Sequence, residues 1–408
     1  MSAKNLPRPI GILFEYSAFL IVGSLLALFW ANINYDSYHG FVHHDLISNL
    51  KHSSIHFVVN DIFMVFFFGI AMKEVTEAFL PGGSLSSFDK AALPVIGTIG
   101  GVVGPATLFV VLALLFKQGH AQTAMLHGWA IPTATDIAYS WLFAKIVFGA
   151  SHPAVTFLLV LAVLDDLIGM GIIAIFYSSD IKVMYLGLLA LGMAMAFGLR
   201  KMNVKNFWPY VLLGGIPAWF GLLYTGVHSS LALVFIVPFM PAAIDGEDKF
   251  FDSEEMEEEH DTLNAFEHFF KSPVDIGLFF FGLANAGVPA EAAGLGTAIT
   301  ISSIFFGKTF GIFLFSMIGN KVFKMAFPDH TGYKELFVLG VVAAIGFTVA
   351  IFVTTVAFGE PPAALKGEEF KGILIAYEKE MKMGALLSFL SGFTALVLGK
   401  VLKIKKVE

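Results

Sequence analysis

Two adjacent carboxylates, Asp165 and Asp166, stand in the middle of an apolar run that extends from about residue 154 to residue 177. A run of this length can cross the hydrocarbon core of a bilayer as an α-helix. Each charge at that depth costs at least about 2.5–3.5 kcal/mol on insertion scales, so two together need compensating partners. Neighbouring helical residues point about 100° apart. One carboxylate can therefore face a central site while the other turns toward a neighbouring helix.

The composition places the whole chain in a membrane. Its 408 residues are 57% hydrophobic and 14% charged, whereas soluble domains are about a quarter charged. We therefore expect an all-α polytopic membrane protein, with one integral membrane domain over residues 1–408 and the lipid bilayer as its surroundings. Cysteine is absent, which excludes disulfides and thiolate metal sites.

Hydropathy predicts about twelve transmembrane helices. Gly214 to Pro217 is the expected divider between the seventh and the eighth. An even number places both termini on one side, and most of the lysines and arginines fall on that side, so both termini are expected to be cytoplasmic. The spans are expected near 10–32, 56–80, 92–116, 124–148, 153–177, 182–200, 206–219, 220–240, 262–288, 293–318, 335–358 and 378–402.

The strongly polar stretch from Asp245 to Asp261 falls in a predicted cytoplasmic loop and contains a run of glutamates. A charge run of this kind is usually solvated and without regular structure. Attraction of cations to an entrance through its local field is the alternative interpretation.

Two of the predicted spans are interrupted. Pro132 breaks the fourth span, and Gly346 with Thr348 breaks the eleventh. Unwound backbone inside a bilayer must line a cavity or be buried in protein, because its freed polar groups need partners. Interrupted spans at matching positions in two halves are typical of a transporter binding site. We expect an inverted-repeat fold in which these discontinuous helices cross, with core repeats roughly at 92–177 and 293–402.

Polar groups near these breaks are candidates for the site. Asp136 follows the first break and can offset the positive ends of half-helices or ligate a cation; a simple N-cap is the alternative. Thr135 offers a hydroxyl for capping or for ligation. Lys308, inside the tenth predicted span, needs a carboxylate partner, and the Asp165–Asp166 pair is the obvious candidate. Position 302 is Ser, which excludes a phosphate-binding loop before Gly307-Lys308-Thr309.

Other titratable residues have a structural as well as a functional interpretation. Asp61 and Glu74 lie toward the two ends of the second predicted span, where an exposed helix-end carboxylate is the ordinary account. His228 in the eighth span is either a packing residue or a group that titrates near neutral pH. The role of Asp275 stays open. The start of the ninth span is amphipathic and carries Glu267, His268 and Lys271.

This inventory favours cation transport over enzymatic chemistry. Hard alkali cations prefer oxygen ligands, so two ionised carboxylates with a hydroxyl suit Na⁺ or Li⁺. Protons compete for the same carboxylates, and neighbouring acids titrate as a coupled group. A site of this kind can carry a cation or protons, which is the chemistry of an antiporter. We expect no enzyme activity, no cofactor and no nucleic-acid partner.

The sequence resembles the NhaA-type sodium/proton antiporters. The matching stretches follow one order along most of the chain, which makes the match specific. They are Asn60-Asp61 with Glu74, Trp129 to Ala138, Leu164 to Leu167, Gly226 to His228, Phe266 to His268, Ala284 to Val288, Gly307-Lys308 and Gly346 to Thr348.

The resemblance implies electrogenic exchange of more than one proton for each exported Na⁺ or Li⁺ across a bacterial cytoplasmic membrane, with activity that rises at alkaline pH. Asp166 would be the main cation ligand and Asp165 the exchangeable partner of Lys308. Asp136 and Thr135 would support the site. The residues that would fall in pH-response regions are Glu74, Glu267, His268 and His228, with Asp61 as a further candidate.

Departures from the family pattern lie at the expected cytoplasmic mouth. Glu77 and Ala78 stand where a basic residue and then an acid are expected, and Lys271 stands where a histidine is common. The pH threshold of the family is therefore not transferred. The segment from Asn32 to Asn60 is short for a hairpin that joins dimers, so a homodimer is a weaker expectation than transport.

Two alternatives remain open from the sequence. A Na⁺-coupled symporter of a related fold would take up an organic anion without moving protons in exchange. A cation channel would carry far larger currents, but the sequence has a charged cluster with a lysine counter-ion rather than a repeated carbonyl filter.

Overall fold

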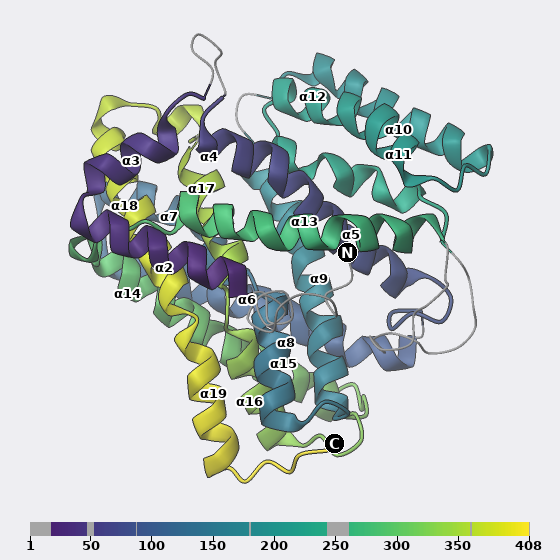
Figure 1. Cartoon of the computed structure of the whole chain (residues 1–408). Helices are drawn as coiled ribbons and strands as arrows, with labels where there is room; N and C mark the ends of the chain where they lie inside the picture. The colour runs from purple at the N-terminus through teal and green to yellow at the C-terminus, as the bar shows by residue number, and fades with distance from the viewer. Residues whose placement is uncertain are drawn as a thin grey trace, which may run out of the picture.

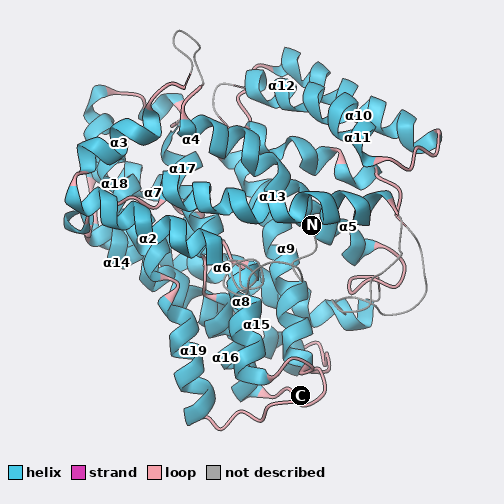
Figure 2. Cartoon of the chain, in the orientation of Figure 1, coloured by secondary structure: helices cyan, strands magenta, loops and turns pink. Residues whose placement is uncertain are grey.

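The computed structural model describes residues 18–46, 53–86, 88–178, 181–242, 261–359 and 361–407, and within these ranges every regular element is a helix (Figures 1 and 2). A single isolated β-bridge joins Asp45 and Ser54 in the described part of the chain. The expected acidic loop 245–261 lies outside the described residues except for Asp261. The all-α expectation is confirmed for these ranges.

Eighteen α-helices are present in the described residues. They are α2 (Ala18–Ile33), α3 (Tyr35–His43), α4 (Ile55–Phe57), α5 (Met64–Phe79), α6 (Phe88–Phe116), α7 (Gly119–His127), α8 (Ile137–Phe148), α9 (Pro153–Phe176), α10 (Leu186–Lys201), α11 (Phe207–Pro209), α12 (Ile216–Thr225), α13 (Thr262–Asn285), α14 (Leu295–Ser302), α15 (Thr309–Lys321), α16 (Tyr333–Ala343), α17 (Phe347–Gly359), α18 (Glu368–Leu387) and α19 (Leu390–Val401).

Seven helical stretches of the described chain are long and apolar enough to cross a membrane, or eight if the bent pair α16 and α17 is one span. Further apolar helices of 10–17 residues include α2 and α8. The protein is thus a multi-pass membrane protein, because lipid-facing backbone must satisfy its polar groups within helices. The count of twelve stays a prediction.

The expected division at Gly214 to Pro217 is wrong. One continuous helical span runs from Phe207 to Thr225, and the chain breaks later, at Gly226, which adopts φ +92°. The segment Tyr210–Gly215 is π-helical and leads into α12, which has Pro217 in its first turn. Pro217 therefore lies inside the continuous span, directly after a π-helical turn that already interrupts the regular α-helical hydrogen bonds, one of which a proline cannot donate.

Two other π-helical segments interrupt the spans that carry candidate residues. Val58–Phe63 contains Asp61 and leads into α5, and Ser303–Lys308 joins α14 to α15 with Lys308 at its end. Such wide turns occur often at functional sites, because they re-aim the side chains of one turn without ending the helix. Here they orient one acid and one base inside the helix bundle.

Helices α6 and α15 pack at very short range through glycines. A Cβ on Gly100 would collide with the carbonyl oxygen of Gly311, and one on Gly104 would collide with that of Gly307. Small residues spaced by four allow the backbones of membrane helices to approach closely. The glycine face of α6 also meets the stem of Lys308, whose Cε would lie 3.8 Å from a Cβ on Gly101.

Two spans are broken at their middle. The first consists of α7, a 3₁₀ turn Ile131–Thr133 and α8, with extended backbone at Ala134 and Asp136. The second consists of α16 and α17, which are bent by 47°. The breaks touch, since the backbone N–H of Asp136 donates to the carbonyl of Ile345 at 2.6 Å. Breaks are therefore present where Pro132 and Gly346 predict them, whereas the crossing of the two spans stays a prediction.

The remaining helices surround this centre. Helix α9 packs against α5, α6, α8 and α16. Helices α2 and α13 lie side by side across the middle of the view, and α10 with α12 forms a pair at the upper right (Figure 1). Helix α9 thus brings its two carboxylates to the place where the breaks meet.

Candidate functional site

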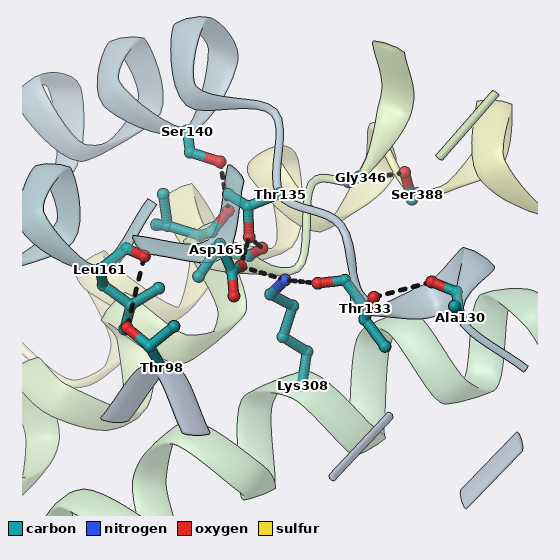
Figure 3. Close-up of polar contacts among 12 residues, drawn as sticks. Thr98, Ala130, Thr133, Thr135, Ser140, Leu161, Asp165, Lys308, Gly346 and Ser388 are labelled. Carbon is teal, nitrogen blue, oxygen red and sulfur yellow. Dashed lines mark hydrogen bonds and ion pairs between the residues drawn. The ribbon is translucent and has the colours of Figure 1, made fainter. Parts of the chain in front are cut away.

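The centre of the site is a buried ion pair. Lys308 Nζ lies 2.5 Å from Oδ2 of Asp165, and both side chains are fully shielded from solvent (Figure 3). Lys308 also donates to the carbonyl oxygen of Thr133. The hydroxyl of Thr135 donates to the same Asp165 oxygen at 2.6 Å, with the carbonyl of Ala343 at 3.0 Å as an alternative acceptor. Lys308, Asp165 and Thr135 therefore form one connected polar group.

The ends of two half-helices explain why these groups are tolerated in the membrane. Thr133 ends the turn after α7, and Ala343 is the last residue of α16. Carbonyl groups at such ends carry partial negative charge and lack partners within the helix. The ammonium of Lys308 and the hydroxyl of Thr135 offset one end each.

Asp136 serves the opposite ends of the broken spans. Its Oδ1 accepts from the backbone N–H of Tyr139 at 3.3 Å and so caps α8. Its Oδ2 accepts from the backbone N–H of Thr348 at 3.0 Å, in the first turn of α17, and from the Thr348 hydroxyl. One buried carboxylate therefore faces the positive ends of two half-helices, and the capping interpretation of Asp136 describes its contacts.

A residue that sequence reasoning missed completes the second break. The backbone N–H groups of Gly346 and Phe347 donate to the hydroxyl oxygen of Ser388 at 3.0 and 3.2 Å (Figure 3). Ser388 lies just after α18, and its own hydroxyl donates to the carbonyl of Ala385 at 2.6 Å. Nothing in the local sequence singles out Ser388, because the N–H groups that it accepts from lie 42 and 41 residues away along the chain.

Two carboxylate oxygens of the pair have no protein partner in the part of the chain that the structure describes. Oδ1 of Asp165 and Oδ1 of Asp166 are shielded and make no hydrogen bond with the described residues. An unpaired buried acceptor is costly, so it needs a proton or a cation. Carboxylate oxygens beside a hydroxyl and carbonyls fit a hard cation. Among the described residues no group of three His, Cys, Asp or Glu side chains is arranged as a metal-holding cluster.

The expected pH-response residues divide into separate groups. Lys73 Nζ lies 2.5 Å from Glu267 Oε2 and 2.7 Å from Glu77 Oε1, which joins α5 to α13. Lys271 lies 3.7 Å from the other oxygen of Glu267. Glu74 lies on the same turn of α5 as Lys73. Glu77 and Lys271, two of the departures from the family pattern, thus take part in one ion-pair network.

Asp61 and His228 lie together elsewhere. The hydroxyl of Ser229 donates to Oδ1 of Asp61 at 2.8 Å, and the indole N–H of Trp219 donates to the backbone carbonyl of Asp61 at 2.6 Å. The ring of His228 caps the following 3₁₀ turn by accepting from the backbone N–H of Ser230 at 3.3 Å. His268 is exposed on α13 and Asp275 is half-buried, so the structure does not bring all these candidates to one place.

A second buried polar cluster joins three elements. Asn60 and Asn285 exchange side-chain hydrogen bonds of 3.3 and 3.1 Å, and the hydroxyl of Thr355 donates to Asn285 at 3.1 Å. These residues come from the second predicted span, α13 and α17. Asn60 and Asn285 belong to the stretches that carry the family resemblance. The motifs do not predict their contact, because the two residues are 225 positions apart in the sequence.

Comparisons with known proteins identify the family of this chain. A family model described as Na⁺/H⁺ antiporter 1 matches residues 15–402. The Na(+)/H(+) antiporter NhaA of Desulfitobacterium hafniense (strain DSM 10664 / DCB-2) is 47% identical over 404 residues, which cover 98% of each chain. The NhaA of Geobacter sulfurreducens (strain ATCC 51573 / DSM 12127 / PCA) is 43% identical over 403 residues, 98% of this chain and 99% of the relative.

A solved structure has a similar fold. The sodium proton antiporter MjNhaP1 from Methanocaldococcus jannaschii at pH 8 covers 97% of this chain and 98% of its own, with a TM-score of 0.52 and 15% sequence identity. At this identity the likeness concerns the fold. The family match and the full-length relatives confirm the resemblance read from the motifs: the chain belongs to the Na⁺/H⁺ antiporter 1 family.

Proposed function

We propose that this protein is a secondary antiporter that exports Na⁺ or Li⁺ in exchange for protons. The observation that carries the proposal is the buried Lys308–Asp165 pair beside Asp166, with one unpartnered oxygen on each carboxylate among the described residues. Family membership and the names of the full-length relatives support Na⁺ and H⁺ as the two exchanged ions.

The exchange follows from competition at these oxygens. Without a cation, Asp166 holds a proton and Asp165 is paired with the Lys308 ammonium. A cation that binds between the two carboxylates displaces the proton of Asp166 and takes over the charge of Asp165 that Lys308 had balanced. Lys308 then releases a proton, because an unpaired ammonium in an apolar interior is costly.

This scheme makes transport electrogenic. The site holds two exchangeable protons in one state and one monovalent cation in the other, so each cycle moves net positive charge inward. Asp166 is the proposed main ligand, Asp165 shares the cation, and Thr135 and Asp136 hold the surrounding backbone.

Alternating access would come from movement of the core around a fixed site. We place this movement in the repeats 92–177 and 293–402, whose broken spans would cross at Pro132 and Gly346 and meet through the Asp136–Thr348 contact. We place the protein in the bacterial cytoplasmic membrane, with both termini cytoplasmic, and expect a homodimer to be compatible with transport but not required.

pH regulation is the further part of the proposal. Activity should rise at alkaline pH, where protons no longer occupy the carboxylates. Glu74, Glu267 and His268 at one end, and Asp61 with His228 at the other, are the candidate responding groups. The ion-pair network around Lys73 supports a pH threshold of activity particular to this chain. Glu77 and Lys271, which belong to this network, are departures from the family pattern.

The test is Na⁺-dependent collapse of a preformed pH gradient in everted membrane vesicles. Wild type should collapse the gradient on addition of Na⁺ or Li⁺, and Asp166→Asn should not. Asp275→Asn is the matched control, since it neutralises an acid on α13 that contacts neither Asp165 nor Lys308, and it should retain exchange. Full activity of Asp166→Asn would refute the site.

The same vesicles distinguish the two alternatives. A symporter would need an organic anion for Na⁺ movement and would leave the pH gradient intact. A channel would dissipate a Na⁺ gradient without moving protons in exchange. The lysine counter-ion in the site argues against a channel, because conduction requires weak binding at several sites.

A further inference from the structure

One face of α17 runs from the ion site to the far end of the second broken span. Thr348, Phe352 and Thr355 follow one another at spacings of four and three residues, which places them on the same face of this helix. Thr348 begins this face and binds Asp136. Thr355 stands about 10 Å further along the axis, at 1.5 Å of rise per residue. The contacts of this face therefore show how the site is closed toward the far end of α17.

The first of these contacts is an aromatic layer around Phe352. This residue is fully buried. The centroid of its ring lies 4.9 Å from that of Phe68 on α5 and 6.3 Å from that of Phe281 on α13. The ring of His228 lies 5.2 Å away on a further side. Aromatic rings at these separations attract one another and bury apolar surface, so this layer separates the site from the far end of α17.

A polar contact follows one turn beyond the aromatic layer. The hydroxyl of Thr355 donates to Oδ1 of Asn285 at 3.1 Å. Asn285 exchanges side-chain hydrogen bonds of 3.3 and 3.1 Å with Asn60, and all three residues are buried. Thr355 belongs to the proposed core repeat 293–402, whereas Asn60 and Asn285 lie outside both repeats. The cluster therefore ties the part that is proposed to move to the rest of the protein.

The bond between Thr355 and Asn285 can open without leaving a polar group unpaired. The same Thr355 hydroxyl has a second acceptor on its own helix, the carbonyl of Ile351 at 3.1 Å. Asn285 keeps its two bonds with Asn60 and also donates to the carbonyl of Phe281 at 3.0 Å. A buried polar group left without a partner would be costly. Hydrogen bonds between membrane helices have modest net strengths, which suits a contact that forms and breaks in each transport cycle.

We propose that Asn60, Asn285 and Thr355 form a releasable latch that holds the ion site closed on the outer side of the membrane. The inference rests on the proposed function and names the contact that breaks before the site opens outward. In the proposed topology the eleventh span begins in the cytoplasm, because both termini are cytoplasmic and the number of the span is odd. The end of α17 that carries Thr355 therefore faces outward. When the core moves, Thr355 leaves Asn285 and turns to Ile351, and the aromatic layer separates with it.

The test uses the absence of cysteine from this chain. Phe352→Cys places a single thiol in the buried aromatic layer, and a membrane-impermeant methanethiosulfonate reports its exposure in vesicles of known orientation. In right-side-out vesicles, Phe352→Cys with Thr355→Val should be labelled about fivefold faster than Phe352→Cys alone, because loss of one interhelical hydrogen bond shifts the equilibrium between closed and open states by about that factor. Everted vesicles should show no such increase.

Thr354→Val in the same Phe352→Cys background is the matched control. Thr354 is buried beside Thr355, and its hydroxyl donates to the carbonyl of Ala350 on its own helix at 2.7 Å. The control makes the same chemical change without loss of a contact to α13, so its labelling rate should equal that of Phe352→Cys alone. Thr355→Ser keeps the hydroxyl and should also give that rate.

Equal labelling in the Thr355→Val and Thr354→Val backgrounds would overturn the inference. An increase in everted vesicles would overturn it as well, because the opening would then not be confined to the outer side. If Thr355→Val does not fold, Thr355→Ala takes its place, and a labelling rate equal to that of Thr355→Ser overturns the latch. The labelling is independent of transport, so a wild-type protein that leaves the pH gradient intact on addition of Na⁺ contradicts the proposed function itself.

Discussion

Lys308 Nζ and Asp165 Oδ2 lie 2.5 Å apart with both side chains fully shielded, and the lysine is additionally anchored on a half-helix end at Thr133. A buried ion pair of this kind adds little stability relative to an apolar pair, but removal of one partner leaves an uncompensated charge. The pair therefore contributes little to the stability of the fold. It suits ion exchange, because a bound cation can replace the Lys308 ammonium as the counter-ion of Asp165.

The first prediction concerns this pair. Lys308→Gln should lower the free energy of unfolding by about 3–5 kcal/mol, because Asp165 is left buried without a counter-ion. The double variant Lys308→Gln with Asp165→Asn should recover most of that loss. Thermal unfolding of the purified protein in detergent measures both.

Lys271→Gln is the control for that prediction. Lys271 is exposed and lies 3.7 Å from Glu267 on the same helix, and a pair at the surface contributes about 0–1 kcal/mol, so this variant should lose no more than that. Additive losses in the Lys308 and Asp165 variants, without recovery in the double variant, would contradict a specific pair.

A second prediction follows from the two caps that Asp136 provides. Asp136→Ala should cost more than the ~1 kcal/mol typical of a single N-cap, because both α8 and α17 lose an acceptor. Asp136→Asn should cost less than Asp136→Ala, because its amide oxygen still caps one of the two helices, although its NH2 group cannot accept at the other. Thr348→Val removes one donor and should cost about 1 kcal/mol. Unfolding temperatures that do not follow this order would contradict the double cap.

A third prediction concerns acid sensitivity at the start of α9. Nδ1 of His152 accepts from the backbone N–H of Ala154 at 3.0 Å, which a protonated ring could not do. Burial lowers the pKa of His152 below its ordinary value, and His330 acts in the same sense while Glu335 opposes it. The unfolded chain then takes up the proton first, so the contribution of this cap is complete above about pH 6.5 and is lost as the pH falls below it.

His152→Asn tests this, because asparagine caps a helix at every pH. The unfolding temperature of wild type should fall on acidification below about pH 6.5, and that of His152→Asn should fall less. His268→Asn, at an exposed position on α13, should follow wild type. Parallel curves for wild type and His152→Asn would refute the cap as an acid-sensitive element.

The sequence predicts those features of the site that cost the most free energy inside a bilayer. Lys308, Asp136 and the two breaks each carry a cost in lipid that only a few partners can offset. Breaks are accordingly present at Pro132 and Gly346. Residue patterns alone left the partner of Lys308 open within the Asp165–Asp166 pair.

The features that were missed depend on contacts between distant segments. The role of Ser388 becomes visible only when the end of α18 meets the break at Gly346. Lys73 reads as a helix-end charge until α13 brings Glu267 to it. The expected break at Gly214 to Pro217 failed for a different reason, since a π-helical turn carries the chain through a glycine pair and a proline that would end an ordinary helix in water.

The most direct test of the account counts protons released when the purified protein binds Na⁺. In a weakly buffered detergent solution with a pH-indicating dye, wild type should release more than one proton for each ²²Na⁺ bound, from Asp166 and Lys308. Asp166→Asn should bind no Na⁺ and release none. Na⁺ binding by wild type without proton release would contradict competition between the cation and protons at Asp165, Asp166 and Lys308.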